Sequence, residues 1–174
     1  LHQKSRDMRS IMDNLSFIME DMSRNLRTGY AYHCIESTDL TTVNPHSCEN
    51  GIGISFNHAL DTNQWVYYIE PSSGKIFKAT YTPPADPLSS FVQLTPNEVE
   101  IDTSASYFSV LGAERAPESP GPDLQPFVTI KLVGKITSKG IETPFSLSFS
   151  STMVRDLAPR FFIFISSGFG VPKS

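Results

Sequence analysis

The chain has 174 residues, enough for about one domain with a core of its own. A net charge of −4 does not suggest nucleic acid as a partner, because phosphate binding needs a basic face. No run of about 18 apolar residues occurs in it, so the sequence predicts no membrane-spanning segment within these residues. Thirteen prolines and ten glycines favour a body that is rich in loops and strands.

The first 27 residues have the period of an amphipathic helix. Apolar residues recur at steps of three and four and form one stripe, while the charged residues fall mostly elsewhere. Gly29 follows at the point where a helix end is expected. We therefore predict a helix within residues 1–29, with a packing face made of Met8, Ile11, Met12, Leu15, Ile18, Met19, Met22 and Leu26.

The two cysteines, Cys34 and Cys48, flank a polar segment that contains Pro45. We predict a disulfide that closes a surface loop, and a loop of about 15 residues closed in this way gains roughly 3 kcal/mol from chain entropy. Such a bond places a domain outside the cytoplasm. Two alternatives stay open here: two unrelated buried thiols, or a zinc site with His33, Cys34, His46 and Cys48 as ligands, whose spacing differs from the usual paired-cysteine motifs.

Short runs of β-branched and aromatic residues, separated by turn residues, follow Gly29. The clearest hairpin joins 64–70 to 75–81 through a Ser-Ser-Gly turn. Further strands are predicted at 52–58, 91–94, 99–101, 107–111, 127–136 and 145–153, and surface loops at 30–51, 82–87 and 112–126. Together these elements predict an α+β fold, in which the long N-terminal amphipathic helix packs on an antiparallel β-sheet.

The chain divides into three predicted parts. These are the helix at 1–29, a crosslinked loop with the antiparallel sheet at 30–157, and a C-terminal tail at 158–174. Within the tail, 161–165 is apolar at every position. That run is interpreted either as a last buried strand or as a segment that pairs with a neighbouring subunit.

Motifs for catalysis are absent from the sequence, which has no H-E-x-x-H, no G-x-S-x-G and no glycine-rich phosphate loop. His58 lies near Asp61, but serine is so abundant that this spacing does not indicate a triad. Asp86, Asp102 and Asp123 fall in predicted loops or at strand ends without a D-x-D-x-D calcium loop, and calcium binding is left open with no ligand assigned. We predict no enzyme activity, no cofactor and no metal site.

Residues 14–34, Asn-Leu-Ser-Phe-Ile-Met-Glu-Asp-Met-Ser-Arg-Asn-Leu-Arg-Thr-Gly-Tyr-Ala-Tyr-His-Cys, resemble the type IV pilin-like proteins, most of all minor pilins and type II secretion-like pseudopilins. Within them, 20–29 fits the run that ends the soluble helix of that family. Segments that resemble the family's strands follow in the same order at 75–78, 94–101, 126–132 and 144–147. The resemblance covers most of residues 8–156, and the apolar first half of the family's helix is expected upstream of Leu1.

The resemblance implies a structural subunit of a type IV pilus-like or pseudopilus filament, extracellular or periplasmic, that assembles with other pilin-like subunits through its N-terminal helix. It also implies an inner-membrane anchor upstream of Leu1, and a filament exterior formed by 30–51 and 112–126. One alternative is a minor or tip subunit that acts as a binding or adhesion module. Trp65, Tyr67 and Tyr68 would be its recognition patch, and strand alternation predicts that only one of the two tyrosines faces solvent. The other alternative is an unrelated extracellular domain on a helical stalk.

Overall fold

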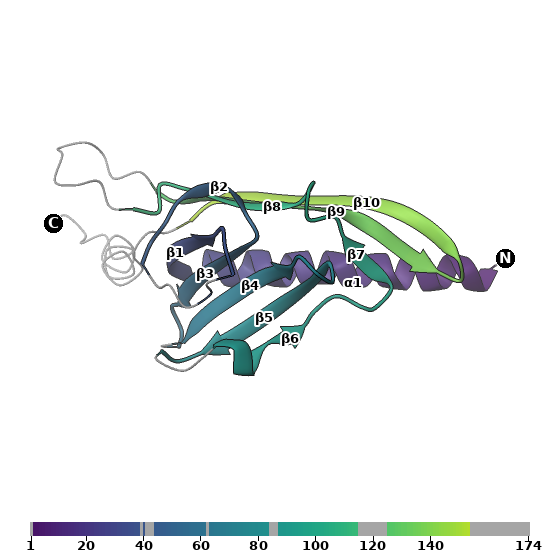
Figure 1. Ribbon diagram of the computed structural model, residues 1–174, viewed down its shortest axis with the longest axis horizontal. Helices are drawn as coiled ribbons and strands as arrows, with labels where there is room; N and C mark the ends of the chain where they lie inside the picture. The colour runs from purple at the N-terminus through teal and green to yellow at the C-terminus, as the bar shows by residue number, and fades with distance from the viewer. Residues whose placement is uncertain are drawn as a thin grey trace, which may run out of the picture.

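A computed structural model describes residues 2–38, 40, 44–61, 63–83, 87–114 and 125–153. They form one long helix, α1 (His2–Arg27), one short 3-10 helix, η1 (Pro87–Ser90), and ten strands (Figure 1). The strands are β1 (Gly29–Ile35), β2 (Cys48–Gly51), β3 (Gly53–His58), β4 (Gln64–Glu70), β5 (Lys75–Tyr81), β6 (Val92–Gln93), β7 (Val99–Ile101), β8 (Tyr107–Leu111), β9 (Phe127–Ser138) and β10 (Ile141–Thr152).

The strands form two antiparallel sheets. Sheet A has the order β1-β3-β4-β5-β6, and sheet B has the order β10-β9-β8-β2. Strand β7 also joins sheet B, because β8 pairs with the first residues of β9 and β7 pairs with Gly134–Ile136 farther along it. The chain is therefore mostly β, and the predicted fold class, α+β with a long helix packed on one antiparallel sheet, is wrong.

The error has a physical cause. Local alternation marks the strands and the hairpins β4–β5 and β9–β10, which the structure contains. It does not say which distant segments pair, and sheet B depends on such pairs. Cys48 of β2 lies opposite Val110 of β8, about sixty residues later in the chain. Only these long-range pairings separate the strands into two sheets.

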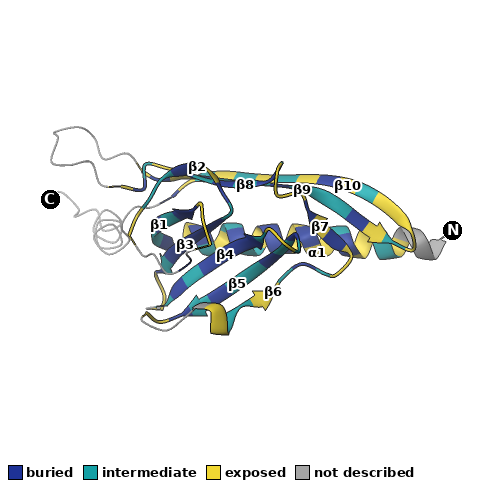
Figure 2. Cartoon of the chain, viewed as in Figure 1, coloured by how far each residue is buried: buried dark blue, intermediate teal, exposed yellow. Residues whose placement is uncertain are grey.

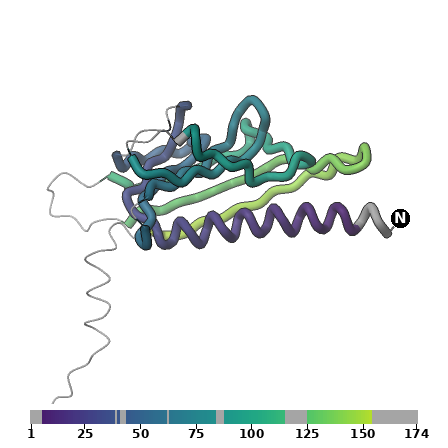
Figure 3. Tube along the Cα trace, turned by 90° about the horizontal axis from the view of Figure 1, so that it is seen from below, coloured from purple at the N-terminus to yellow at the C-terminus, as the bar shows by residue number. Residues whose placement is uncertain are grey.

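Helix α1 and both sheets share one core. Six of the eight residues predicted for the packing face are buried, namely Ile11, Leu15, Ile18, Met19, Met22 and Leu26, while Met8 and Met12 are partly buried against the same core. Phe56 of sheet A and Phe108 of sheet B lie in this core with them. Figure 2 shows buried residues recurring along the helix, and the described strands lie on one side of it (Figure 3).

The C-terminal end of α1 is closed by side chains. Thr28 Oγ1 donates to Asn25 O at 2.9 Å. The buried Tyr32 hydroxyl lies 2.7 Å from Leu26 O and 2.6 Å from Gly29 O, so it can serve either carbonyl. Because the last carbonyls of a helix lack partners inside the helix, these contacts satisfy groups that burial would otherwise leave unpaired. They also lead the chain directly into β1.

The segment between α1 and β3 is not the surface loop predicted at 30–51. It contains β1 and β2, and Tyr32, Ile35 and Leu40 are buried. Ile35 and Leu40 belong to a second core on the other face of sheet A, together with Val66, Tyr68, Ala79 and Tyr81. Sheet A is therefore buried on both faces. The connection between β1 and β2 folds over its second face, where Leu40 packs.

The predicted tail at 158–174, with its apolar run at 161–165, lies outside the described residues. The predicted loop at 112–126 is described only at its two ends.

Truncation of a side chain should cost much more stability on the buried face of α1 than on its exposed face. Leu15→Ala, at a position that is 1% exposed, should lower the free energy of unfolding by about 2–5 kcal/mol. Phe17→Ala, at a position that is 67% exposed, should change it by less than about 0.5 kcal/mol. Urea unfolding of both variants checks this, and an equal loss at the two sites would contradict the orientation of the helix.

Candidate functional site

The predicted disulfide between Cys34 and Cys48 is present, with the two Cα atoms 5.6 Å apart. Cys34 belongs to β1 of sheet A and Cys48 to β2 of sheet B, so the bond joins the two sheets. Both residues are buried in the shared core. A disulfide indicates a non-reducing environment, extracellular or periplasmic.

Gly51, the last residue of β2, makes room for the disulfide. A Cβ atom at this position would lie 2.6 Å from Cys34 Sγ and 2.9 Å from Ile35 O. The carbonyl of Ile35 is held in place because it accepts a hydrogen bond from Ile52 N at 2.7 Å. Glycine is therefore required where β1 and β2 converge on the disulfide.

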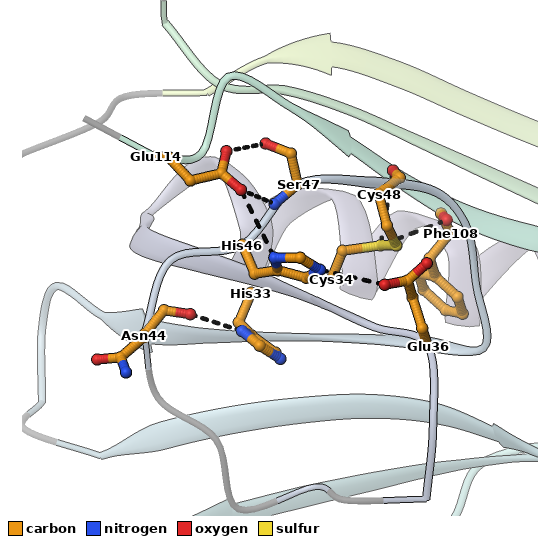
Figure 4. A network of polar contacts seen from close by, with 9 residues as sticks. All are labelled: His33, Cys34, Glu36, Asn44, His46, Ser47, Cys48, Phe108 and Glu114. Carbon is orange, nitrogen blue, oxygen red and sulfur yellow. Dashed lines mark hydrogen bonds and ion pairs between the residues drawn. A yellow bond between two sulfur atoms is a disulfide. The ribbon is translucent and has the colours of Figure 1, made fainter. Parts of the chain in front are cut away.

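A group of polar residues beside the disulfide ties the β1–β2 connection to the chain that follows β8 (Figure 4). We call it the loop cluster, and it consists of His33, Glu36, Asn44, His46, Ser47 and Glu114. The backbone of the connection pairs with β1, since Cys34 N donates to His46 O at 2.9 Å and His46 N donates to Tyr32 O at 3.1 Å.

His46 lies between two carboxylates in the loop cluster. Its Nε2 is 3.1 Å from Glu36 Oε2, and its Nδ1 is 3.6 Å from Glu114 Oε1. Glu114 also accepts hydrogen bonds from Ser47, from the backbone N at 2.6 Å and from Oγ. Burial disfavours the charged carboxylate, but these hydrogen bonds and the nearby His46 outweigh it, so the pKa of Glu114 is lowered.

The alternative prediction of a zinc site is not supported, because Cys34 and Cys48 are bonded to each other and cannot supply thiolate ligands. The structure does bring His33 and His46 together, with ring centroids 5.4 Å apart. Among the described residues, however, no group of three or more His, Cys, Asp or Glu side chains is placed to hold a metal ion. His33 Nδ1 instead lies 2.5 Å from the carbonyl oxygen of Asn44.

The aromatic residues of β4 pack inside the protein. Tyr67 and Tyr68 are both buried, so the prediction that one of them faces solvent is wrong. The Tyr67 hydroxyl accepts a hydrogen bond from Asn25 Nδ2 at 2.9 Å and lies 3.3 Å from Asp21 Oδ2, and burial raises its pKa. Trp65 is partly buried against the shared core. Tyr67 contacts α1 and Tyr68 lies in the second core, so neither tyrosine is exposed as the recognition patch would require.

His58, weighed for catalysis, and Asp102, weighed for calcium binding, both have structural partners. His58 is buried, with Nε2 3.1 Å from Thr28 Oγ1, Nδ1 3.7 Å from Asp61 Oδ2 and its ring stacked on Trp65. Asp102 accepts hydrogen bonds from the backbone N and the hydroxyl of Ser104, which lower its pKa and hold a turn. Asp86 and Asp123 lie outside the described residues.

The loop cluster was not predicted as a unit. His33 and His46 were noticed for their spacing to the cysteines, but Glu114 comes 67 residues after Ser47 in the chain. No local pattern connects those two positions, so only the tertiary structure reveals their contact.

Comparisons with family models, with curated proteins and with solved structures find no match for this chain. Within the part of the chain that the structure describes, no helix is long and apolar enough to cross a membrane.

Removal of the disulfide should destabilise the protein without abolishing its core. The double variant Cys34→Ser, Cys48→Ser should lose about 3 kcal/mol of unfolding free energy, because the reduced chain regains the entropy of an open loop. Thermal unfolding without reductant measures the loss, and addition of reductant should reproduce it in the unaltered protein only. A melting temperature that ignores both the mutation and the reductant would contradict a stabilising crosslink.

The lowered pKa of Glu114 predicts a dependence of stability on pH. A group whose pKa is lower in the folded state contributes stability above its unfolded pKa, and that contribution is lost as the pH falls through the folded value. Glu114→Gln should therefore unfold at lower urea concentration at pH 7 and show a smaller further loss between pH 5 and pH 3 than the unaltered chain. Glu49→Gln, an exposed position of β2 outside the loop cluster, is the matched control and should follow the unaltered chain. Identical pH profiles for all three proteins would refute the assignment.

Proposed function

We propose that the chain is a structural subunit of a type IV pilus-like or pseudopilus filament that assembles through its N-terminal helix. The observation that carries the proposal is the division of α1 into two faces. One face is buried in the shared core, and the opposite face carries exposed residues along the length of the helix. The resemblance of residues 14–34 to the pilin-like proteins supports the same role.

A helix of this kind can serve two structures at once. Its inner face holds its own domain, and its outer face and upstream continuation remain for contact with other subunits. Burial of apolar helix surface there would drive assembly at about 25 cal/mol per Å². When every copy uses the same two different surfaces, the contact repeats head to tail and gives an open filament.

The disulfide suits a subunit that works outside the cytoplasm. It joins the two sheets through the core of the domain and stabilises the fold against unfolding. We further propose that the subunit is anchored in the inner membrane, through a segment upstream of Leu1, before it enters the filament.

The stalk alternative fits the contacts less well. A stalk helix keeps its apolar stripe for a partner helix, whereas the stripe of α1 is occupied by β-strands of its own domain. The aromatic form of the tip-adhesion alternative is weakened too, because Tyr67 and Tyr68 are buried.

The test is to look for the chain in assembled filaments. An antibody against the folded domain should decorate fibres or a short pseudopilus in electron micrographs of cells that produce the protein with its native upstream sequence. Cells that lack the protein serve as the control for labelling. Recovery of the protein from those cells only as a free monomer, with unlabelled fibres, would contradict the proposed function.

A further inference from the structure

We propose that the outer face of sheet B, which is turned away from α1, binds one unit of a neutral saccharide. The site is a hollow of about 320 Å³ over β2, β8 and β9, which are neighbours in sheet B (Figure 1). Six described residues line it: Glu49, Asn50, Tyr107, Ser109, Leu111 and Thr129. The proposal goes beyond the filament function and does not depend on it, because all six residues belong to one copy of the chain.

Strand alternation places the lining side chains outside the core. Phe108 and Val110 of β8 lie in the core that sheet B shares with α1. Because neighbouring residues of a strand point to opposite faces of its sheet, the other residues of β8 point away from that core. These are Tyr107, Ser109 and Leu111. Thr129 of β9 lies opposite Ser109 in the ladder and shares its face. The hollow therefore lies on the side of sheet B opposite the helix.

Small side chains form the floor of the hollow, and larger ones form its walls. Ser109 lies opposite Thr129 of β9, and Thr129 lies opposite Ser150 of β10, so a row of hydroxyl groups crosses three strands. Tyr107 precedes this row on β8, and Leu111 follows it. Four residues of extended chain separate the Cα atoms of Tyr107 and Leu111 by about 13.5 Å. This separation leaves room for a six-membered ring between the two side chains.

The rim of the hollow on β2 is polar. Glu49 and Asn50 are exposed at the centre of β2, where the ladder with β8 is irregular. Within the described residues, their side chains form no hydrogen bond or ion pair, and neither does the hydroxyl of Ser109. On the floor, Thr129 Oγ1 has one distant partner, Ser150 Oγ at 3.3 Å. The hollow thus offers a carboxylate, an amide and hydroxyl groups that can still bind a ligand.

This set of groups fits the chemistry of a neutral sugar. A sugar hydroxyl both donates and accepts, so it can donate to the Glu49 carboxylate in a charge-assisted hydrogen bond and also pair with the Asn50 amide. The carbon atoms of a sugar ring form an apolar face, which can pack on the half-exposed ring of Tyr107. Ligand sites commonly combine such an apolar wall with a few polar groups that fix orientation.

Two other ligand classes fit the hollow less well. Among the described lining residues Glu49 alone is charged, and its carboxylate repels a phosphate or carboxylate ligand. Lys131, opposite Tyr107 on β9, is not part of the lining. An ammonium group from a basic peptide would pair with Glu49 and could lie on the ring of Tyr107. However, an ammonium group only donates, so it would leave the amide N–H groups of Asn50 without an acceptor.

Titration with single sugars tests the site. Glucose, galactose, mannose and N-acetylglucosamine are added in turn to the isotope-labelled chain, and amide shifts are followed by NMR. At least one sugar should bind with a Kd on the order of 1 mM, since few groups contact it. The shifts should concentrate at 49–51, 107–111 and 129, and high salt should leave the Kd unchanged because the ligand is neutral.

Variants assign the contacts. Tyr107→Ala should weaken binding about 10-fold through loss of the ring. Glu49→Gln should weaken it about 5-fold, because a charge-assisted hydrogen bond becomes a neutral one. Thr129→Val removes a floor hydroxyl and should also weaken binding. Thr137→Val, the same change at an exposed position of β9 outside the hollow, is the matched control and should bind like the unaltered chain. Thermal unfolding checks that each variant is folded.

The contrary outcomes are distinct. A folded chain in which none of the four sugars shifts these amides would overturn the proposal, and so would equal losses in Thr129→Val and Thr137→Val. Shifts produced only by Nα-acetyl-lysine amide, and abolished by high salt or by Glu49→Gln, would assign the hollow to a basic peptide instead. None of these results bears on filament assembly, which antibody labelling of cells that produce Tyr107→Ala measures separately and which should be unchanged.

Discussion

The structure depends on the burial of one stripe of α1 in a core that both sheets share. Met22 and Leu26 are fully buried there, among side chains from sheet A and sheet B. Sheet A and sheet B have separate hydrogen-bond ladders, so apolar contact with the helix and with each other, rather than a continuous ladder, holds them together. The disulfide then joins strands that this core has already brought within 5.6 Å between Cα atoms.

The same burial explains why α1 can be both a core element and a candidate assembly surface. Because its apolar residues face the strands, charged residues and Phe17 are left on the opposite, exposed face of the helix. Exposed charges contribute little to the stability of a monomer, so contact of this face with other subunits would not disturb the fold of the domain. The pilin-like resemblance thus agrees with a physical property of this chain, the division of α1 into a buried apolar face and an exposed charged face.

Much of the local structure could be predicted from the sequence. The helix, the β4–β5 hairpin and the disulfide each have a local signal: a period of 3.6, a turn between alternating strands, and two cysteines around a polar segment. Strands β1 and β2 have none. The alternation of β1 is broken by a bulge in which Ala31 has a φ of 54°, and β2 is four residues long with two polar residues at its centre. The two-sheet arrangement and the contacts of Glu114 arise from pairings far apart in the chain, which no local pattern encodes.

Native-state hydrogen exchange tests the shared core most directly. If α1 holds the two sheets together, amides of α1 between Leu15 and Leu26, of β4 and of β9 should exchange through the same global opening, with equal dependence on denaturant. If α1 is instead an appended rod, its amides should exchange through a separate opening of much lower free energy while both sheets stay protected. That second result would contradict the account of the fold and of the two faces of the helix.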